Sequence, residues 1–188
     1  MATGRSVQQL GGQVGPLSIL GAWALSTRAF KRNKVSVLCK VVAAALCNSG
    51  YSYRDVARML GGISYVAVRD AYFSLTMSLP QEQRRFRRCV ALDGADVLMN
   101  GVVYHVWLAR DVDLGEIMSF QGSPDASADD GAKFLAGVAA QCENTPLLRL
   151  GTGLNRPRGL MNLDLYFQTA PAQSFITRLG RLILGSAS

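Results

Sequence analysis

The residue of this sequence best placed to do chemistry is an aspartate at the end of an apolar run. Asp93 closes the stretch Cys89–Asp93, whose other residues are typical of a buried strand. Its carboxylate would offer a hard oxygen ligand to Mg²⁺ or Mn²⁺. Such an ion needs several oxygen ligands, which one side chain does not supply. Asp93 alone would therefore bind a metal ion weakly.

The other acidic residues give Asp93 little support. Asp96 lies three positions further along the same predicted strand, so its side chain points to the opposite face. Asp111 and Asp113 fall in a predicted hairpin turn, away from the strand end. Asp164 is the one late acidic residue that could substitute for a missing ligand. An active site built on Asp93 and Asp164 therefore remains an alternative.

Cysteine and histidine do not form a recognisable metal or disulfide pattern. The chain has four cysteines, with no Cys-x-x-Cys pair, and a single histidine, His105. This spacing excludes a typical zinc site and does not suggest a disulfide framework. We expect the cysteines to be small buried apolar residues in a reducing compartment, which indicates the cytoplasm. No apolar run is long enough for a transmembrane helix, so no membrane partner is expected.

Charge is distributed unevenly along the 188 residues. Residues 1–90 carry thirteen Lys or Arg and three Asp or Glu, a net charge of +10. Residues 91–145 carry two basic and nine acidic residues, a net charge of −7. A basic half followed by an acidic block is typical of a polyanion-binding module ahead of a carboxylate-rich core.

Three short helices are predicted between residues 33 and 75. The first begins near Asn33, which can cap it, and ends at Asn48-Ser49-Gly50; Ser52 and Ser64 can cap the next two. Gly61-Gly62 forces a turn between the second and third helices. This arrangement predicts a helix-turn-helix, with a plain three-helix bundle as the alternative.

In a DNA-binding helix-turn-helix, the third helix enters the major groove of double-stranded DNA. Tyr65 and Arg69 would then meet base edges, and Ser64, Arg54 and Arg58 would contact phosphates. A second basic cluster follows Pro80. It consists of Arg84, Arg85, Arg87 and Arg88. This cluster is either a solvated linker or a further set of phosphate contacts.

The second half of the chain is predicted to be mixed α/β. Asn100-Gly101 is a strong two-residue hairpin signal, and Ser127 precedes a helical pattern. The expected strands are residues 89–93 and 97–99, 102–109, 116–121, 146–150 and a weak one at 163–167. The expected helices are residues 128–142 and a final basic helix at 172–184.

The motifs of this half resemble those of DDE-type transposases of archaeal insertion sequences. The matching stretches are Val90-Ala-Leu-Asp93, the Asn100-Gly101 hairpin, Tyr104-His-Val-Trp107-Leu-Ala109-Arg-Asp111 and Ser123-Pro124. The preceding stretches Ser52-Tyr-Arg-Asp-Val-Ala57 and Ser64-Tyr-Val-Ala-Val68 are similar to the N-terminal region of the same family. The resemblance covers residues 34–150 well and residues 151–188 poorly.

This resemblance implies an RNase H-like core that needs three catalytic carboxylates and two divalent ions. Asp93 matches the first position, but Gly151 stands where the second carboxylate belongs. The third would fall near Thr177, and no acidic residue follows Asp164. The resemblance therefore implies a degenerate, inactive copy that still binds double-stranded DNA. Mg²⁺ or Mn²⁺ would be its cofactor only if activity survives, and a homo-oligomer is possible.

The sequence thus predicts an all-α helix-turn-helix domain followed by an α/β domain with an RNase H-like three-layer core and a mixed sheet. The predicted divisions are a flexible N-terminal arm at 1–30, the helix-turn-helix domain at 31–79, a basic linker at 80–88 and the core at 89–188. A DNA-binding regulator repurposed from a transposase is a further alternative, because it would keep the same two parts without transposition.

Overall fold

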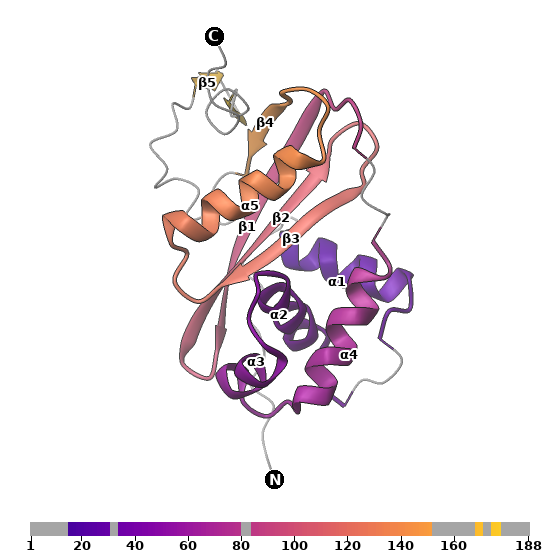
Figure 1. Ribbon diagram of the computed structural model, residues 1–188, viewed down its shortest axis with the longest axis vertical. Helices are drawn as coiled ribbons and strands as arrows, with labels where there is room; N and C mark the ends of the chain where they lie inside the picture. Colours follow the sequence, from indigo (N-terminus) through magenta and orange to yellow (C-terminus); the bar gives the residue numbers. More distant parts are fainter. Residues whose placement is uncertain (1–14, 31–33, 80–83, 152–167, 171–173, 178–188) are drawn as a thin grey trace.

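The fold is known from a computed structural model that describes residues 15–30, 34–79, 84–151, 168–170 and 174–177. The helices are α1 (Pro16–Ser26), α2 (Val37–Asn48), α3 (Tyr53–Leu60), α4 (Tyr65–Thr76) and α5 (Ala128–Ala140). The strands are β1 (Cys89–Met99), β2 (Val102–Asp111), β3 (Ile117–Ser123), β4 (Leu147–Leu150), β5 (Gln168–Ala170) and β6 (Ser174–Thr177). The chain is therefore a mixed α/β protein, as Figure 1 shows.

Serine side chains start four of the helices. The hydroxyl oxygens of Ser36, Ser52, Ser64 and Ser127 each accept a hydrogen bond from the backbone N–H three residues later. The predicted caps of α3 and α4 are thereby confirmed. The cap predicted at Asn33 is wrong, because Ser36 accepts from the N–H of Cys39 and α2 begins at Val37.

The strands form one sheet in the order β3-β2-β1-β4-β6-β5. The first three are an antiparallel meander whose tight turn is made by Asn100 (φ 50°) and Gly101 (φ 80°), the left-handed pair that a type I′ hairpin requires. Strand β4 runs parallel to β1, so the chain must cross over between them, and α5 makes that crossing. The predicted hairpin, meander and crossover helix are confirmed.

The two faces of the sheet carry different helices. Trp107 and Ala109 of β2 belong to a buried cluster with Phe134 of α5, and the rings of Trp107 and Phe134 lie 5.8 Å apart. Val106 and Leu108 belong to a second cluster, formed with the four N-terminal helices. Because successive side chains of a strand point to opposite faces, α5 covers one face and the N-terminal helices pack on the other.

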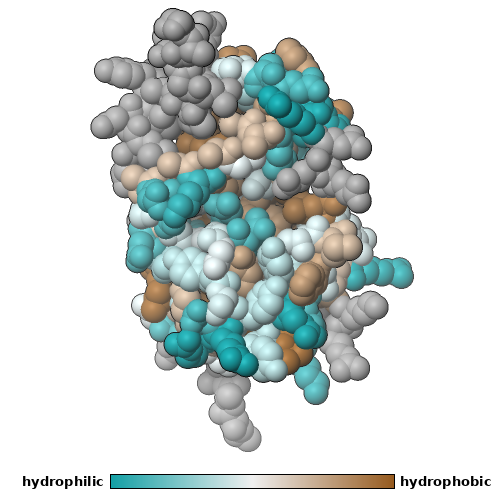
Figure 2. Space-filling model, viewed as in Figure 1, coloured by the Kyte–Doolittle hydropathy of each residue, from teal (hydrophilic) through white to brown (hydrophobic). Residues whose placement is uncertain are grey.

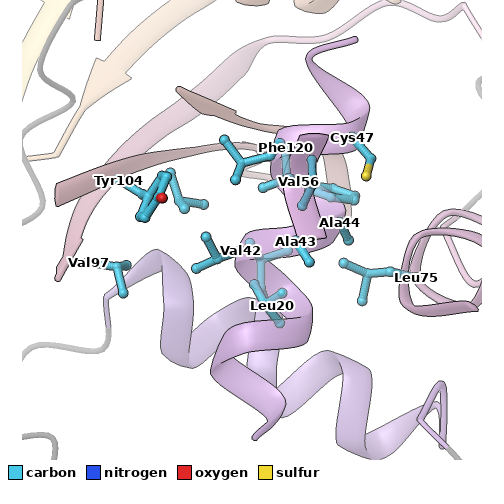
Figure 3. Close-up of a cluster of buried hydrophobic side chains, with 14 of the residues drawn as sticks. Leu20, Val42, Ala43, Ala44, Cys47, Val56, Leu75, Val97, Tyr104 and Phe120 are labelled. Carbon is cyan, nitrogen blue, oxygen red and sulfur yellow. The ribbon is translucent and has the colours of Figure 1, made fainter. Parts of the chain in front are cut away.

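The N-terminal helices and the sheet therefore share one core. Figure 3 shows Val42 and Val56 from helices meeting Val97, Tyr104 and Phe120 from strands. Helix α1 takes part too, because Leu20 and Ala24 are fully buried (0% exposed). The arm predicted at residues 1–30 thus holds a packed helix within its described part.

The closest approach of helix and sheet is at Gly122 of β3. A Cβ at this position would lie 2.9 Å from the backbone nitrogen of Leu46 in α2, so only glycine fits without displacing the helix. The Asn48 amide donates to the carbonyl of Phe120 over 2.6 Å, and the N–H of Gly122 donates to the hydroxyl of Ser49 over 3.0 Å. These contacts fix α2 on β3.

The final basic helix predicted at residues 172–184 is wrong over Ser174–Thr177, which form β6. Phe175, Ile176 and Thr177 are residue types that favour strands, and β4 offers an unpaired edge on which they form a ladder. The weak strand predicted at 163–167 lies outside the described residues. Within the described part of the chain, no helix is long and apolar enough to cross a membrane. None of the four cysteines forms a disulfide bond.

Candidate functional site

The first candidate site is the surface that α3 and the start of α4 present to solvent, which we call the α3–α4 face. It consists of Arg54, Arg58, Ser64, Tyr65 and Arg69, all of them exposed. These are the five residues that the sequence predicted for DNA contact within the helical region. The structure brings them together at one end of the molecule.

Small and branched residues beneath this face hold the two helices together. Val56 and Leu60 of α3 and Val68 of α4 are buried in the shared core. Gly61 (φ 58°) and Gly62 (φ 66°) adopt backbone angles that other residues rarely take, and they allow the four-residue connection to reverse direction. Two helices joined by a short glycine turn are the framework from which the exposed residues project.

On the α3–α4 face, Arg54 of α3 contacts Tyr65 of α4. The Arg54 guanidinium lies 5.7 Å from the centre of the Tyr65 ring, within the range of a cation–π interaction. Tyr65 is the first residue of α4, and 49% of it is exposed. A planar cation beside an aromatic ring at a helix N-terminus can bind phosphate and stack on, or hydrogen-bond to, a base.

The other two arginines of the α3–α4 face pair with acidic neighbours. Arg58 contacts Asp55 one turn earlier, and Arg69 lies 3.0 Å from the carboxylate of Asp70. All four side chains are substantially exposed, so these pairs contribute only about 0–1 kcal/mol each. Phosphate can therefore compete with either carboxylate for its arginine at little cost.

Exposed apolar side chains lie on α4 from its first turn and just after its end. Val66, Phe73 and Met77 are exposed by 38%, 50% and 81%. Figure 2 shows hydrophilic and hydrophobic patches alternating over the end of the molecule that α3 and α4 form. The charged residues of α4, Arg69 and Asp70, lie in its first two turns, the part that a major-groove contact would use.

The second candidate is the arginine cluster at residues 84–88. The sequence suggested either a solvated linker or a set of phosphate contacts, and the structure shows neither for Arg87. Arg87 is buried, and its guanidinium lies 2.6 Å from the carboxylate of Asp111, with side-chain exposures of 4% and 5%. It also donates to the carbonyl of Gln141 over 3.4 Å. The predicted DNA-binding role of Arg87 is therefore wrong, because a buried and paired guanidinium cannot reach a phosphate.

The remaining arginines of this cluster also have partners in the fold. Arg88 pairs with Asp113, Arg85 lies 3.5 Å from Glu116, and Arg84 donates to the carbonyl of Cys142 over 3.1 Å. The cluster is thereby folded back on the turn between β2 and β3. Phosphate contact by Arg84, Arg85 and Arg88 stays a prediction, but two of these charges are already matched by carboxylates.

Asp111 organises this turn as well as neutralising Arg87. One of its oxygens accepts the backbone N–H groups of Asp113 (2.9 Å) and Leu114 (3.0 Å). Burial alone would raise the pKa of Asp111, but these N–H groups and the Arg87 guanidinium together hold it below its ordinary value. Asp111 is therefore a structural carboxylate, committed to the turn in its ionised form.

The third candidate is Asp93. It lies within β1 on the face away from α5, since its neighbour Leu92 packs in the α5 cluster. The Arg110 guanidinium lies 3.4 Å from its carboxylate, and 16% of the Asp93 side chain is exposed. Burial raises the pKa of Asp93, and the positive charges of Arg110 and Arg149 counteract part of that rise.

The positions around Asp93 that would carry further ligands hold none among the described residues. The N–H of Gly151 donates to the carbonyl of Leu92 over 2.8 Å, so residue 151 lies beside Asp93's strand but has no side chain. Asp96 pairs with His105 over 2.6 Å, on the other face. No three Asp, Glu, His or Cys side chains gather in the described part of the chain. Asp164 lies outside it.

This environment does not fit the two-metal centre that the transposase resemblance implies. A pair of divalent ions needs several carboxylates around one point, and Asp93 instead faces two guanidiniums. Arg110 was missed at the sequence level. Counting back from the Asn100–Gly101 turn pairs Ala91 with Arg110, which places Arg110 diagonally across from Asp93 on the same face. The hairpin signal therefore contained the information needed to find it.

Comparisons with known proteins give one distant relative. The chain is 28% identical over 142 residues to an uncharacterized archaeal protein, MJ0017 of Methanocaldococcus jannaschii. The match covers 74% of this chain and 66% of that protein, just under two thirds of its length. No family model matches this chain, and no solved structure matches it.

Proposed function

We propose that this chain is a transposase-derived protein that binds double-stranded DNA through the α3–α4 face and does not catalyse strand transfer. The observation that carries the proposal is the arrangement of Arg54, Tyr65 and Arg69 at the N-terminal end of an exposed helix. Helix N-termini and guanidiniums both favour phosphate. A protein acting on chromosomal DNA would work in the cytoplasm, where cysteine thiols stay reduced.

The sheet topology supports the transposase part of the proposal. An RNase H-like core has three antiparallel strands, then a helix, then a strand parallel to the first and beside it. Strands β1 to β3, helix α5 and strand β4 follow this order. Asp93 in β1 and Gly151, directly after the adjacent β4, lie where the first and second catalytic positions of that family would. Strand β6 pairs antiparallel with β4, where the sequence predicted a final helix instead of a strand.

Loss of catalysis is supported by the charges around Asp93. In an active two-metal site, the positive charge near the carboxylate is supplied by the ions. In this chain Arg110, with Arg149 nearby, supplies it permanently. A guanidinium neutralises the carboxylate but cannot polarise water or hold a leaving oxygen as a metal ion does.

Binding is tested by fluorescence anisotropy with a labelled duplex of about 20 base pairs, two helical turns. We expect Arg54→Ala/Arg69→Ala to weaken binding by about 10-fold or more. The matched control, Lys133→Ala/Arg149→Ala, removes the same charge away from the α3–α4 face and should leave the affinity nearly unchanged. Equal losses in both variants would show that binding follows net charge rather than this face.

Catalysis is tested by incubating the same duplex with Mg²⁺ or Mn²⁺ and measuring strand length. The proposal expects an intact duplex. Cleavage that Asp93→Ala abolishes would instead establish the alternative, an active enzyme with a rearranged acidic site.

A further inference from the structure

The tip of the β1–β2 hairpin reaches the end of α3. The Tyr104 hydroxyl donates to the carbonyl of Met59 over 2.8 Å, and the Asn100 amide donates to the carbonyl of Leu60. Figure 1 shows this tip lying beside α3, at the end of the sheet remote from α5. Two residues that lie 40 and 45 positions later in the sequence thus bind the last turn of a helix of the proposed DNA-binding face.

The two carbonyls are ones that the helix leaves without partners. Met59 and Leu60 are its last two residues, and the final carbonyls of an α-helix receive no N–H from within it. Helix α3 has eight residues, so a large part of its backbone belongs to its ends. Gly61 caps the helix by donating its N–H to the carbonyl of Ala57, and the hairpin satisfies the carbonyls of Met59 and Leu60.

The segment after these carbonyls leads directly to α4. Gly61 and Gly62 have positive φ angles and little conformational preference of their own. A Cβ at Gly61 would lie 2.8 Å from the Asn100 amide nitrogen, so the turn passes directly against the hairpin. Because four residues separate the helices, the place where α3 ends determines where α4 begins.

The two donors have different surroundings. Tyr104 is 1% exposed and lies in the core shared by the sheet and the N-terminal helices, as Figure 3 shows. Asn100 is exposed at the hairpin tip, and its φ of 50° places it as the first residue of the tight turn. The sheet thus presents one buried donor and one donor at its hairpin tip to the end of α3.

From this geometry we propose that Asn100 and Tyr104 are positioning residues for DNA binding: they fix the end of α3, and through the glycine turn they set the angle at which α4 meets DNA. The inference rests on the proposed function of the α3–α4 face. It makes the sheet part of the DNA-binding apparatus. Residues 31–79 alone would then bind DNA poorly, even with every contacting arginine present.

The variants that test this remove the donors and keep the surrounding structure. Tyr104→Phe deletes one hydroxyl from a buried ring, and Asn100→Gly keeps a residue that accepts positive φ. The double variant Tyr104→Phe/Asn100→Gly removes both hydrogen bonds. We expect it to bind the duplex about 10-fold more weakly, because part of their stabilisation acts on the position of α4. Asn100→Asp keeps the turn but places a carboxylate against the Leu60 carbonyl, and it should bind more weakly than Asn100→Gly.

Val138→Ala, in the α5 cluster on the other face, is the control for stability. It should lower Tm at least as much as the double variant and leave DNA affinity unchanged. An unchanged affinity in the double variant, with wild-type protein binding DNA, would overturn the inference. A loss of affinity in the Val138→Ala control equal to that of the double variant would also overturn it.

Hydrogen exchange separates this inference from the proposed function. The amides of residues 61–64 should exchange faster in the double variant than in wild type, with or without DNA. Faster exchange, in a wild-type protein that bound no duplex, would show that the two donors fix the glycine turn and that the proposed function is what fails. Unchanged exchange at these amides would contradict the positioning role.

Discussion

Replacing Arg87 with methionine should destabilise the protein more than any change to its arginine neighbours. Arg87 and Asp111 are 4% and 5% exposed, and 2.6 Å separates their charged atoms. Removing one partner of a buried pair typically costs about 3–5 kcal/mol, because the other charge stays buried and uncompensated. Asp111 keeps two backbone N–H donors after the change, so we expect the lower end of that range, about 3 kcal/mol.

The matched control is Arg88→Met, one residue along the chain. Its partner is Asp113, and the two side chains are 70% and 41% exposed. An exposed pair contributes about 0–1 kcal/mol, so the two substitutions should differ by about 2 kcal/mol or more. Both remove one positive charge and place a methionine in the same segment, which leaves burial as the main difference.

Urea unfolding at neutral pH, followed by far-UV circular dichroism, measures both free energies of unfolding. A third variant, Arg87→Met/Asp111→Asn, removes both charges and keeps an oxygen for the N–H groups of Asp113 and Leu114. It should be more stable than Arg87→Met alone. The reasoning is refuted if Arg87→Met costs no more than Arg88→Met, or if the second substitution adds to the loss.

Three further predictions concern other contacts. Gly122→Ala should destabilise the fold by about 1–3 kcal/mol in the same urea assay, because its Cβ would press on α2. The control is Gly137→Ala at an exposed position of α5, which should stabilise the fold by about 0.5–1 kcal/mol. The reverse order of stabilities would contradict the packing of Gly122 against α2. The ionised Asp111 stabilises the fold above its ordinary pKa of about 4, and this contribution is lost as the pH falls toward the lowered folded-state pKa. Asp111→Asn should therefore show a smaller fall in Tm between about pH 5 and pH 3 than wild type, and an identical fall would argue against it. Ser64→Ala removes the cap of α4 and should cost about 1 kcal/mol of unfolding free energy, with no loss if the cap contributes nothing.

Local signals in the sequence predicted the local structure. Serine caps at Ser52 and Ser64 start the helices where they were expected, and Asn100-Gly101 makes the expected hairpin. Each of these depends on a few neighbouring residues and one backbone preference, so a single sequence is sufficient to find them. The strand at Ser174–Thr177 was missed because a ladder with β4 decides its structure, and that ladder is not local.

The charge pattern misled at one point for a related reason. The arginines of the 84–88 cluster contribute to the basic first half of the sequence, and Asp111, Asp113 and Glu116 belong to the acidic block. The fold brings the two groups together, so Arg85, Arg87 and Arg88 are paired. Separation of charge along the chain is thus not separation in space. On the α3–α4 face, Arg58 and Arg69 pair with Asp55 and Asp70, their neighbours in the sequence, and stay exposed.

The surroundings of Asp93 were predicted in part. The absence of a carboxylate at Gly151 was read from the sequence, and the structure places that glycine beside the strand of Asp93. The two arginines facing Asp93 were not predicted, because a cross-strand diagonal becomes visible only once the register is known. The positive charges of Arg110 and Arg149 oppose the binding of a metal cation beside Asp93. The sequence argument had rested on missing carboxylates alone.

The central claim is that the α3–α4 face binds DNA phosphates, and its most direct test is the salt dependence of wild-type binding to duplex DNA. With three exposed arginines on that face, log K should fall linearly with log of the salt concentration, with a slope of about −3. An affinity that does not change with salt, or no binding at the lowest salt concentration, would contradict the account.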